Sequence, residues 1–136
     1  MVQHFEDLGK LLLRLGLGGM LLLHGIYKIQ NGIDGMDEDL AAKGLPVALK
    51  YGVYIGEVAA PILIIIGFLT RIGGLCIAGN MAMAIYLKYS SRIFTRIDHN
   101  GGWTIELPML YLVGGLALVF LGGGKFALWR RGGPLG

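Results

Sequence analysis

The chain has 136 residues, of which 54% are hydrophobic and only 15% are charged. Because soluble domains carry about 25% charged residues, this composition excludes an ordinary soluble fold and indicates an integral membrane protein. The net charge is +3, but the sequence has no basic patch interleaved with aromatic residues. We therefore expect the positive charges to contact lipid headgroups rather than nucleic acid.

Four apolar stretches of membrane-spanning length follow one another along the chain. Each has roughly 17 to 19 residues, close to the ~20 that a helix needs to cross a bilayer. We therefore predict a single domain, residues 1–136, folded as an all-α bundle of four transmembrane helices. The predicted spans are Leu11–Ile29, Val53–Leu69, Ile72–Tyr89 and Ile105–Leu121.

The first stretch has a second interpretation, a cleavable signal peptide, because Lys10 and Arg14 give it a charged start. Its length and the lack of an A-x-A-like site after it favour a membrane span. We expect the Arg14 side chain to extend to the lipid headgroups, and pairing with a partner subunit is the alternative.

A loop of about 23 residues, Gln30–Gly52, separates the first two spans, and loops of this length are either functional or disordered. Within it, Met36–Gly44 begins with acidic residues, ends near a lysine and stops at a glycine, which predicts a short helix. Pro46 prevents the helix from continuing. We predict an extracytoplasmic lid whose short helix lies at the membrane interface.

Thr70-Arg71 is the only connection between the second and third spans, so these spans must be antiparallel neighbours. Two ridges of small residues, Gly52–Ala60 and Gly74–Ala82, indicate close helix packing, either within the bundle or between copies of the chain. We expect a homo-oligomer or a complex with a partner subunit. The glycine-rich, basic tail from Gly122 onward is expected to fray.

The membrane orientation is not decided by counting charges, because six Lys or Arg residues fall on each side of the predicted bundle. We place both termini in the cytoplasm, since Arg71 in a tight turn and the basic terminal cluster are difficult to translocate.

Polar side chains gather at one depth of this predicted bundle. Glu57 and Glu106 each lie near the start of a span, and a proline follows each of them shortly afterwards. His24 and Lys28, one helical turn apart, reach a comparable depth at about 1.5 Å per residue. The candidate ligand-binding residues are His24, Lys28, Glu57, Asn80, His99, Trp103 and Glu106.

A charged group that faces lipid is costly, so we expect His24, Lys28, Glu57 and Glu106 to point into the bundle. Two interpretations of the cluster remain open. It is either an ion-pair network, of Lys28 with Glu57 or Glu106, that only holds the helices together, or a pocket for a polar headgroup or a proton relay. Carboxylates and histidines suit a quinone, because its reduction takes up protons at two hydrogen-bonded carbonyls.

Other cofactors fit the sequence less well. A di-iron bundle site would use two Glu-x-x-His pairs, which the sequence lacks, and haem ligation by His24 and His99 would place one ligand in a loop. We predict no metal and no covalently bound cofactor. Cys76 is the single cysteine and lies in a span, where we expect it to pack as a small apolar residue.

A series of short motifs, in this order and spacing, resembles the DoxX family from about residue 10 to about residue 128. The motifs are Arg14-Leu15, Gly19, Gly25-x-x-Lys28, Gly44-Leu45-Pro46, Gly56-Glu57, Gly67-x-x-Thr70-Arg71, Asn80 and His99-x-Gly101-Gly102-Trp103-x-x-Glu106. The resemblance implies a small four-helix protein of the inner (plasma) membrane of a bacterium or archaeon. One branch of the family is associated with a thiosulfate:quinone oxidoreductase complex and others with redox-stress assemblies, while much of the family has no assigned activity.

The function favoured by these observations is a membrane subunit of a redox system that binds a quinone-like or other small amphipathic ligand. The chain has no cysteine cluster and no Gly-rich dinucleotide loop, so electrons would come from a partner or from the substrate. A non-catalytic scaffold that recruits a partner enzyme is the first alternative, and a small transporter is the second. No catalytic residue is assigned, and whether the protein is an enzyme is left open.

Overall fold

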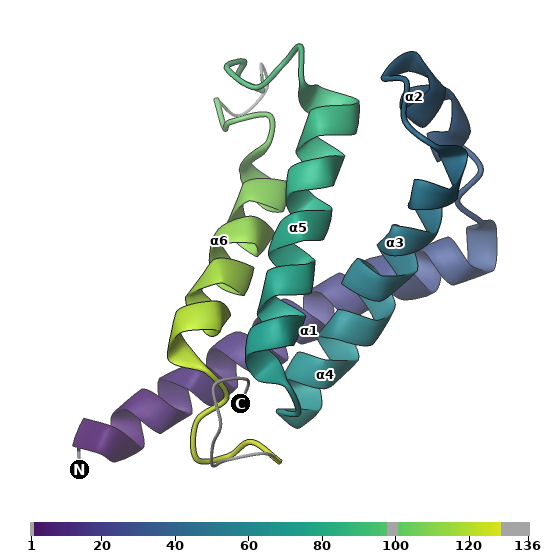
Figure 1. The fold of residues 1–136 in the computed structure, drawn as a ribbon. Helices are drawn as coiled ribbons and strands as arrows, with labels where there is room; N and C mark the ends of the chain where they lie inside the picture. The colour runs from purple at the N-terminus through teal and green to yellow at the C-terminus, as the bar shows by residue number, and fades with distance from the viewer. Residues whose placement is uncertain (1, 98–100, 129–136) are drawn as a thin grey trace.

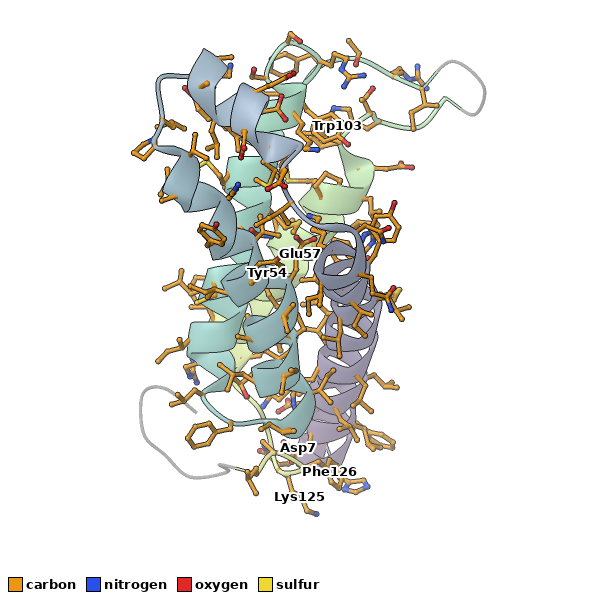
Figure 2. The ribbon with its side chains drawn as sticks, turned by 90° about the vertical axis from the view of Figure 1, so that its right-hand side faces the viewer. Asp7, Tyr54, Glu57, Trp103, Lys125 and Phe126 are labelled. Carbon is orange, nitrogen blue, oxygen red and sulfur yellow. The ribbon has the colours of Figure 1, made fainter. Side chains whose placement is uncertain are left out.

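The computed structural model describes residues 2–97 and 101–128, and the elements in these ranges are all helical. In chain order they are α1 (Val2–Asn31), α2 (Met36–Ala42), η1 (Val47–Tyr51), α3 (Gly52–Tyr54), η2 (Ile55–Ala59), α4 (Ala60–Ile66), α5 (Thr70–Tyr89) and α6 (Glu106–Leu121). Figure 1 shows α5 and α6 side by side, with α3 and α4 beside α5 and α1 crossing behind them. Asp7, Lys125 and Phe126 lie at one end of the molecule and Trp103 at the other (Figure 2).

Three helical runs within the described residues are long and apolar enough to cross a membrane: Val2–Asn31, Val47–Ile66 and Thr70–Tyr89. α6 is also apolar but has 16 residues, which correspond to about 24 Å at 1.5 Å per residue. The predicted class, an all-α membrane protein, is confirmed.

The second run differs from the predicted span at both ends. It begins at Val47, directly after Pro46, whose backbone is extended with φ −61° and ψ 134°. It ends at Ile66, because the turn Gly67–Leu69 contains two left-handed residues, with φ values of 79° and 50°. Thr70-Arg71, predicted as the turn, instead forms the start of α5.

The middle of this run, η2, is a π-helical turn that contains Glu57. Pro61 has no N–H to donate to the carbonyl of Glu57, four residues earlier, so the regular α pattern is interrupted there. The Glu57 carbonyl group packs against Gly25 of α1 so closely that a Cβ at position 25 would overlap it. Turns of this type are frequent at functional sites, and here the turn brings Glu57 next to α1.

Arg14 of α1 is 1% exposed and hydrogen-bonds the end of α4. Its Nε donates to the Ile64 carbonyl at 2.8 Å, its Nη2 to the Ile65 carbonyl at 2.9 Å and its Nη1 to the Gly123 carbonyl at 3.2 Å. The last carbonyls of a helix lack intrahelical donors and carry partial negative charge, so a guanidinium satisfies them well. The prediction that Arg14 extends to the headgroups is therefore wrong.

The described part of the C-terminal tail, residues 122–128, packs onto the same end of the bundle. The backbone N–H of Leu128 donates to the Ile66 carbonyl at 3.1 Å, and that of Lys125 donates to Asp7 Oδ1 at 3.1 Å. Ala127 is 5% exposed. The expectation that the tail frays is thus wrong for these residues, because their backbone groups and one apolar side chain find partners in the bundle.

α5 and α6 approach closely because glycines face each other across their contact. A Cβ at Gly74 would lie 2.5 Å from the Gly115 carbonyl oxygen, and one at Gly115 would lie 2.6 Å from the Gly74 carbonyl oxygen. This part of the predicted small-residue ridge is used within the bundle. The buried apolar core lies between the long helices and consists of Leu17, Leu21, Ala60, Ile64, Ile77, Met81, Tyr111 and Leu118.

The loop after α1 is packed and ion-paired. Its Leu40, in α2, is 0% exposed. The Lys50 ammonium contacts Asp34 Oδ1 at 3.0 Å and Asp37 Oδ1 at 2.9 Å, and the Lys43 ammonium donates to Ser90 Oγ at 2.8 Å. These contacts hold α2 against the start of the second run and the end of α5.

Candidate functional site

A cavity of about 640 Å³ lies between α1, α5, α6 and the run from η1 to η2. The loop that contains α2 forms part of its wall, through Ile33, Met36 and Leu40. Pockets for small molecules commonly have volumes of about 300 to 1,000 Å³, apolar walls and a few convergent polar groups. The size of this cavity fits that description, and its polar groups come from several helices.

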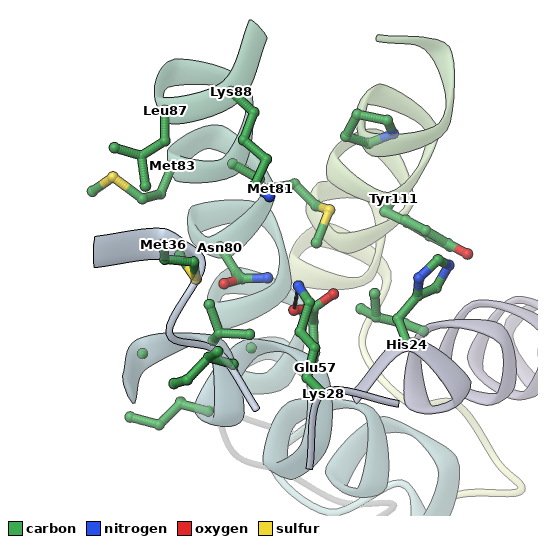
Figure 3. Close-up of a pocket in the computed structure, with 18 of the residues that line it drawn as sticks. His24, Lys28, Met36, Glu57, Asn80, Met81, Met83, Leu87, Lys88 and Tyr111 are labelled. Carbon is green, nitrogen blue, oxygen red and sulfur yellow. Dashed lines mark hydrogen bonds and ion pairs between the residues drawn. The ribbon is translucent and has the colours of Figure 1, made fainter. Parts of the chain in front are cut away.

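The central polar contact is an ion pair between Lys28 of α1 and Glu57 of η2. Lys28 Nζ lies 2.5 Å from Glu57 Oε2, and both residues line the cavity (Figure 3). The Glu57 side chain is 5% exposed and the Lys28 side chain 34%. The carboxylate is therefore buried while the ammonium remains partly accessible from the cavity.

His24 lies one turn before Lys28 on α1 and also lines the cavity. Its imidazole ring packs edge-on against the Tyr111 ring of α6, with 5.9 Å between the ring centroids. Figure 3 shows the two rings together at one side of the cavity. His24 is an exposed residue, and its side chain faces the cavity.

One face of α5 contributes Cys76, Asn80, Ala84 and Lys88 to the cavity. These residues are four positions apart and therefore share one side of the helix. Only Asn80 was selected from the sequence. The same spacing, extended by two turns from Asn80, would have identified Lys88 as a further polar residue at this site.

Three methionines complete the lining, Met36 from α2 and Met81 and Met83 from α5. Methionine side chains are flexible and polarizable, so they adapt to ligands of irregular shape. Sequence reasoning did not identify them, because a methionine in a loop helix or in an apolar span carries no pattern that separates a pocket from a core.

The remaining predicted site residues do not join this cluster. Glu106 is exposed at the first turn of α6, where Leu107, Pro108 and Tyr111 line the cavity instead. The prediction that Glu106 points into the bundle is wrong, because it lies on a different side of the helix and at its very end. Trp103 donates its indole N–H to the Ile93 carbonyl within the loop between α5 and α6, and His99 lies outside the described residues.

The cavity brings together side chains that can donate and accept hydrogen bonds. Glu57, Lys28 and His24 are titratable groups, and the Tyr111 ring lies beside them. Within residues 2–97 and 101–128, no three His, Cys, Asp or Glu side chains lie close enough together to hold a metal ion.

The fold and the cavity define a helical membrane protein with a polar site between its helices. Residues 9–90 match the model of the DoxX family, so the chain belongs to that family, as its motifs predicted. The matched region contains most of α1, the loop, the second run and α5, and thus most of the cavity. Comparisons with curated proteins and with solved structures found no match.

Proposed function

We propose that this DoxX protein is a membrane subunit of a redox system and binds a small amphipathic ligand of the quinone type. The supporting observation is the Lys28–Glu57 ion pair on the wall of a cavity lined mainly by apolar and methionine side chains. A buried ionisable group at membrane depth is costly and marks a functional site by default.

In this proposal the ring of the ligand lies against the methionines and aliphatic side chains, and its oxygens face Lys28 and Glu57. Lys28 donates a hydrogen bond to an oxygen, and Glu57 holds and exchanges a proton close to it. A bound quinone accepts two electrons and two protons when it is reduced to the quinol. The electrons are supplied by a partner subunit or directly by the substrate.

The proposal also assigns α6 as the fourth membrane span. α6 is apolar and packs closely against the side of α5 that carries Gly74, so it would share the depth of α5 in a bilayer. The termini would lie in the cytoplasm and the loop with α2 on the outer side of a prokaryotic inner membrane.

Binding is tested by adding 1,4-naphthoquinone to the purified protein and following its thermal unfolding. At a ligand concentration of 100 times the Kd, a single site stabilises the folded state by about 2.7 kcal/mol. Glu57→Gln keeps the shape of the side chain and removes its charge, so we expect it to abolish most of this shift. Glu106→Gln is the matched control, because Glu106 is exposed and does not line the cavity.

A non-catalytic scaffold is the second candidate, because the Lys28–Glu57 pair also joins α1 to η2. The double variant Lys28→Met/Glu57→Met separates the two functions, since replacing a buried ion pair by apolar residues often preserves stability. If the ligand proposal is correct, this variant folds but does not bind the quinone. If the wild-type protein contains no extractable quinone and shows no shift with added naphthoquinone, the scaffold replaces the redox proposal.

A further inference from the structure

Lys88, in the last turn of α5, directs its side chain into the cavity. Lys88 lines the cavity, and Figure 3 shows its side chain running along α5 toward Met81, on the same side as Asn80. Side chains in a helix tilt toward its N-terminus, so a lysine near the C-terminal end of α5 points back toward the middle of the bundle. A lysine that only anchors a span extends toward the headgroups instead.

The charges around the cavity are not balanced. Of the four lysines on this side of the molecule, Lys28 pairs with Glu57, Lys50 pairs with two aspartates and Lys43 donates to a serine. For Lys88, no carboxylate among the described residues lies within ion-pair distance of its ammonium. The charged groups that line the cavity are therefore two ammonium groups and one carboxylate.

Lys88 is exposed, so its ammonium is accessible to a ligand. A cation on the wall of a cavity lined mainly by apolar side chains favours a ligand that brings negative charge, because a charge-assisted hydrogen bond can form between them. We propose that Lys88 binds an anionic oxygen on the headgroup of the ligand and thereby selects acidic quinones over neutral ones. The inference rests on the proposed function, since it specifies the class of ligand for the same cavity.

The test compares two ring systems that differ by one ionised oxygen. 1,4-Naphthoquinone is neutral, whereas 2-hydroxy-1,4-naphthoquinone is deprotonated at pH 7. We expect the wild-type protein to bind the anion about tenfold more tightly, which corresponds to one well-formed ion pair of about 1.4 kcal/mol. Lys88→Met should reduce this ratio to about one.

Two further variants make the result specific. Lys88→Arg keeps the charge and should keep the preference for the anion. Lys125→Met removes a positive charge at the opposite end of the molecule (Figure 2) and should also leave the preference unchanged. If the wild-type protein binds both rings equally, or if Lys88→Met keeps the preference, the inference is overturned and the quinone site stands. If the wild-type protein binds neither ring, both the site and the inference fail.

Discussion

Replacing Arg14 by methionine tests how the end of the bundle near the termini is held together. Arg14→Met keeps an unbranched apolar stem and removes the three donors to Ile64, Ile65 and Gly123. Hydrogen bonds between membrane helices average about 0.6 kcal/mol each, so the three bonds together contribute about 2 kcal/mol. The variant also leaves buried carbonyls without a donor, at about 1 to 3 kcal/mol for each. We expect a loss of at least about 3 kcal/mol in the free energy of unfolding.

The assay is reversible unfolding in mixed micelles with an increasing fraction of sodium dodecyl sulfate, followed by circular dichroism. Arg14→Lys should fall between the wild type and Arg14→Met, because one ammonium cannot reproduce the planar fork of donors that reaches two carbonyls of α4. Lys125→Met controls for the loss of one positive charge, since Lys125 is exposed. If Arg14→Met unfolds at the same detergent fraction as the wild type, Arg14 does not hold α4 and the reasoning is refuted.

Two further predictions concern α1 and the loop. Gly25→Ala should destabilise the protein by about 1 to 3 kcal/mol in the same unfolding assay, because the added Cβ overlaps the Glu57 carbonyl. Gly16→Ala, on the same helix with open space around it, should be neutral or stabilising by up to about 1 kcal/mol, and equal effects of the two changes would contradict the packing of α1 on η2. Lys50→Met removes both ion pairs of the loop, so hydrogen exchange in α2 should accelerate while the midpoint of thermal unfolding changes by less than about 2 °C. Unchanged exchange in α2 would show that its apolar contacts hold the loop without these pairs.

Much of the helical architecture could be predicted from the sequence because it depends on local properties. Apolar runs of bilayer length, the proline at Pro46 and the left-handed glycine at Gly44 each act on their own neighbourhood. The i,i+4 spacing of His24 and Lys28 likewise places them on one helical face without further information. The family followed from the order of short motifs along the chain, and its model matches residues 9–90.

The partners of the charged side chains were decided only by the tertiary structure. Lys28 had two candidate partners, Glu57 and Glu106, at a similar predicted depth, and the rotation of each helix about its axis selected Glu57. That rotation depends on close contacts such as Gly25 against η2, which involve residues far apart in the chain.

Arg14 shows the same limit most clearly. The sequence alone shows that a cation lies in the first apolar stretch. It does not show where the end of α4 and the C-terminal tail lie relative to that cation. Their carbonyls converge on Arg14 only when the helices pack, and the buried position then becomes more favourable than the headgroups. Burial of a charge depends on donors and acceptors brought together by the whole fold, whereas a membrane span depends on the composition of one segment.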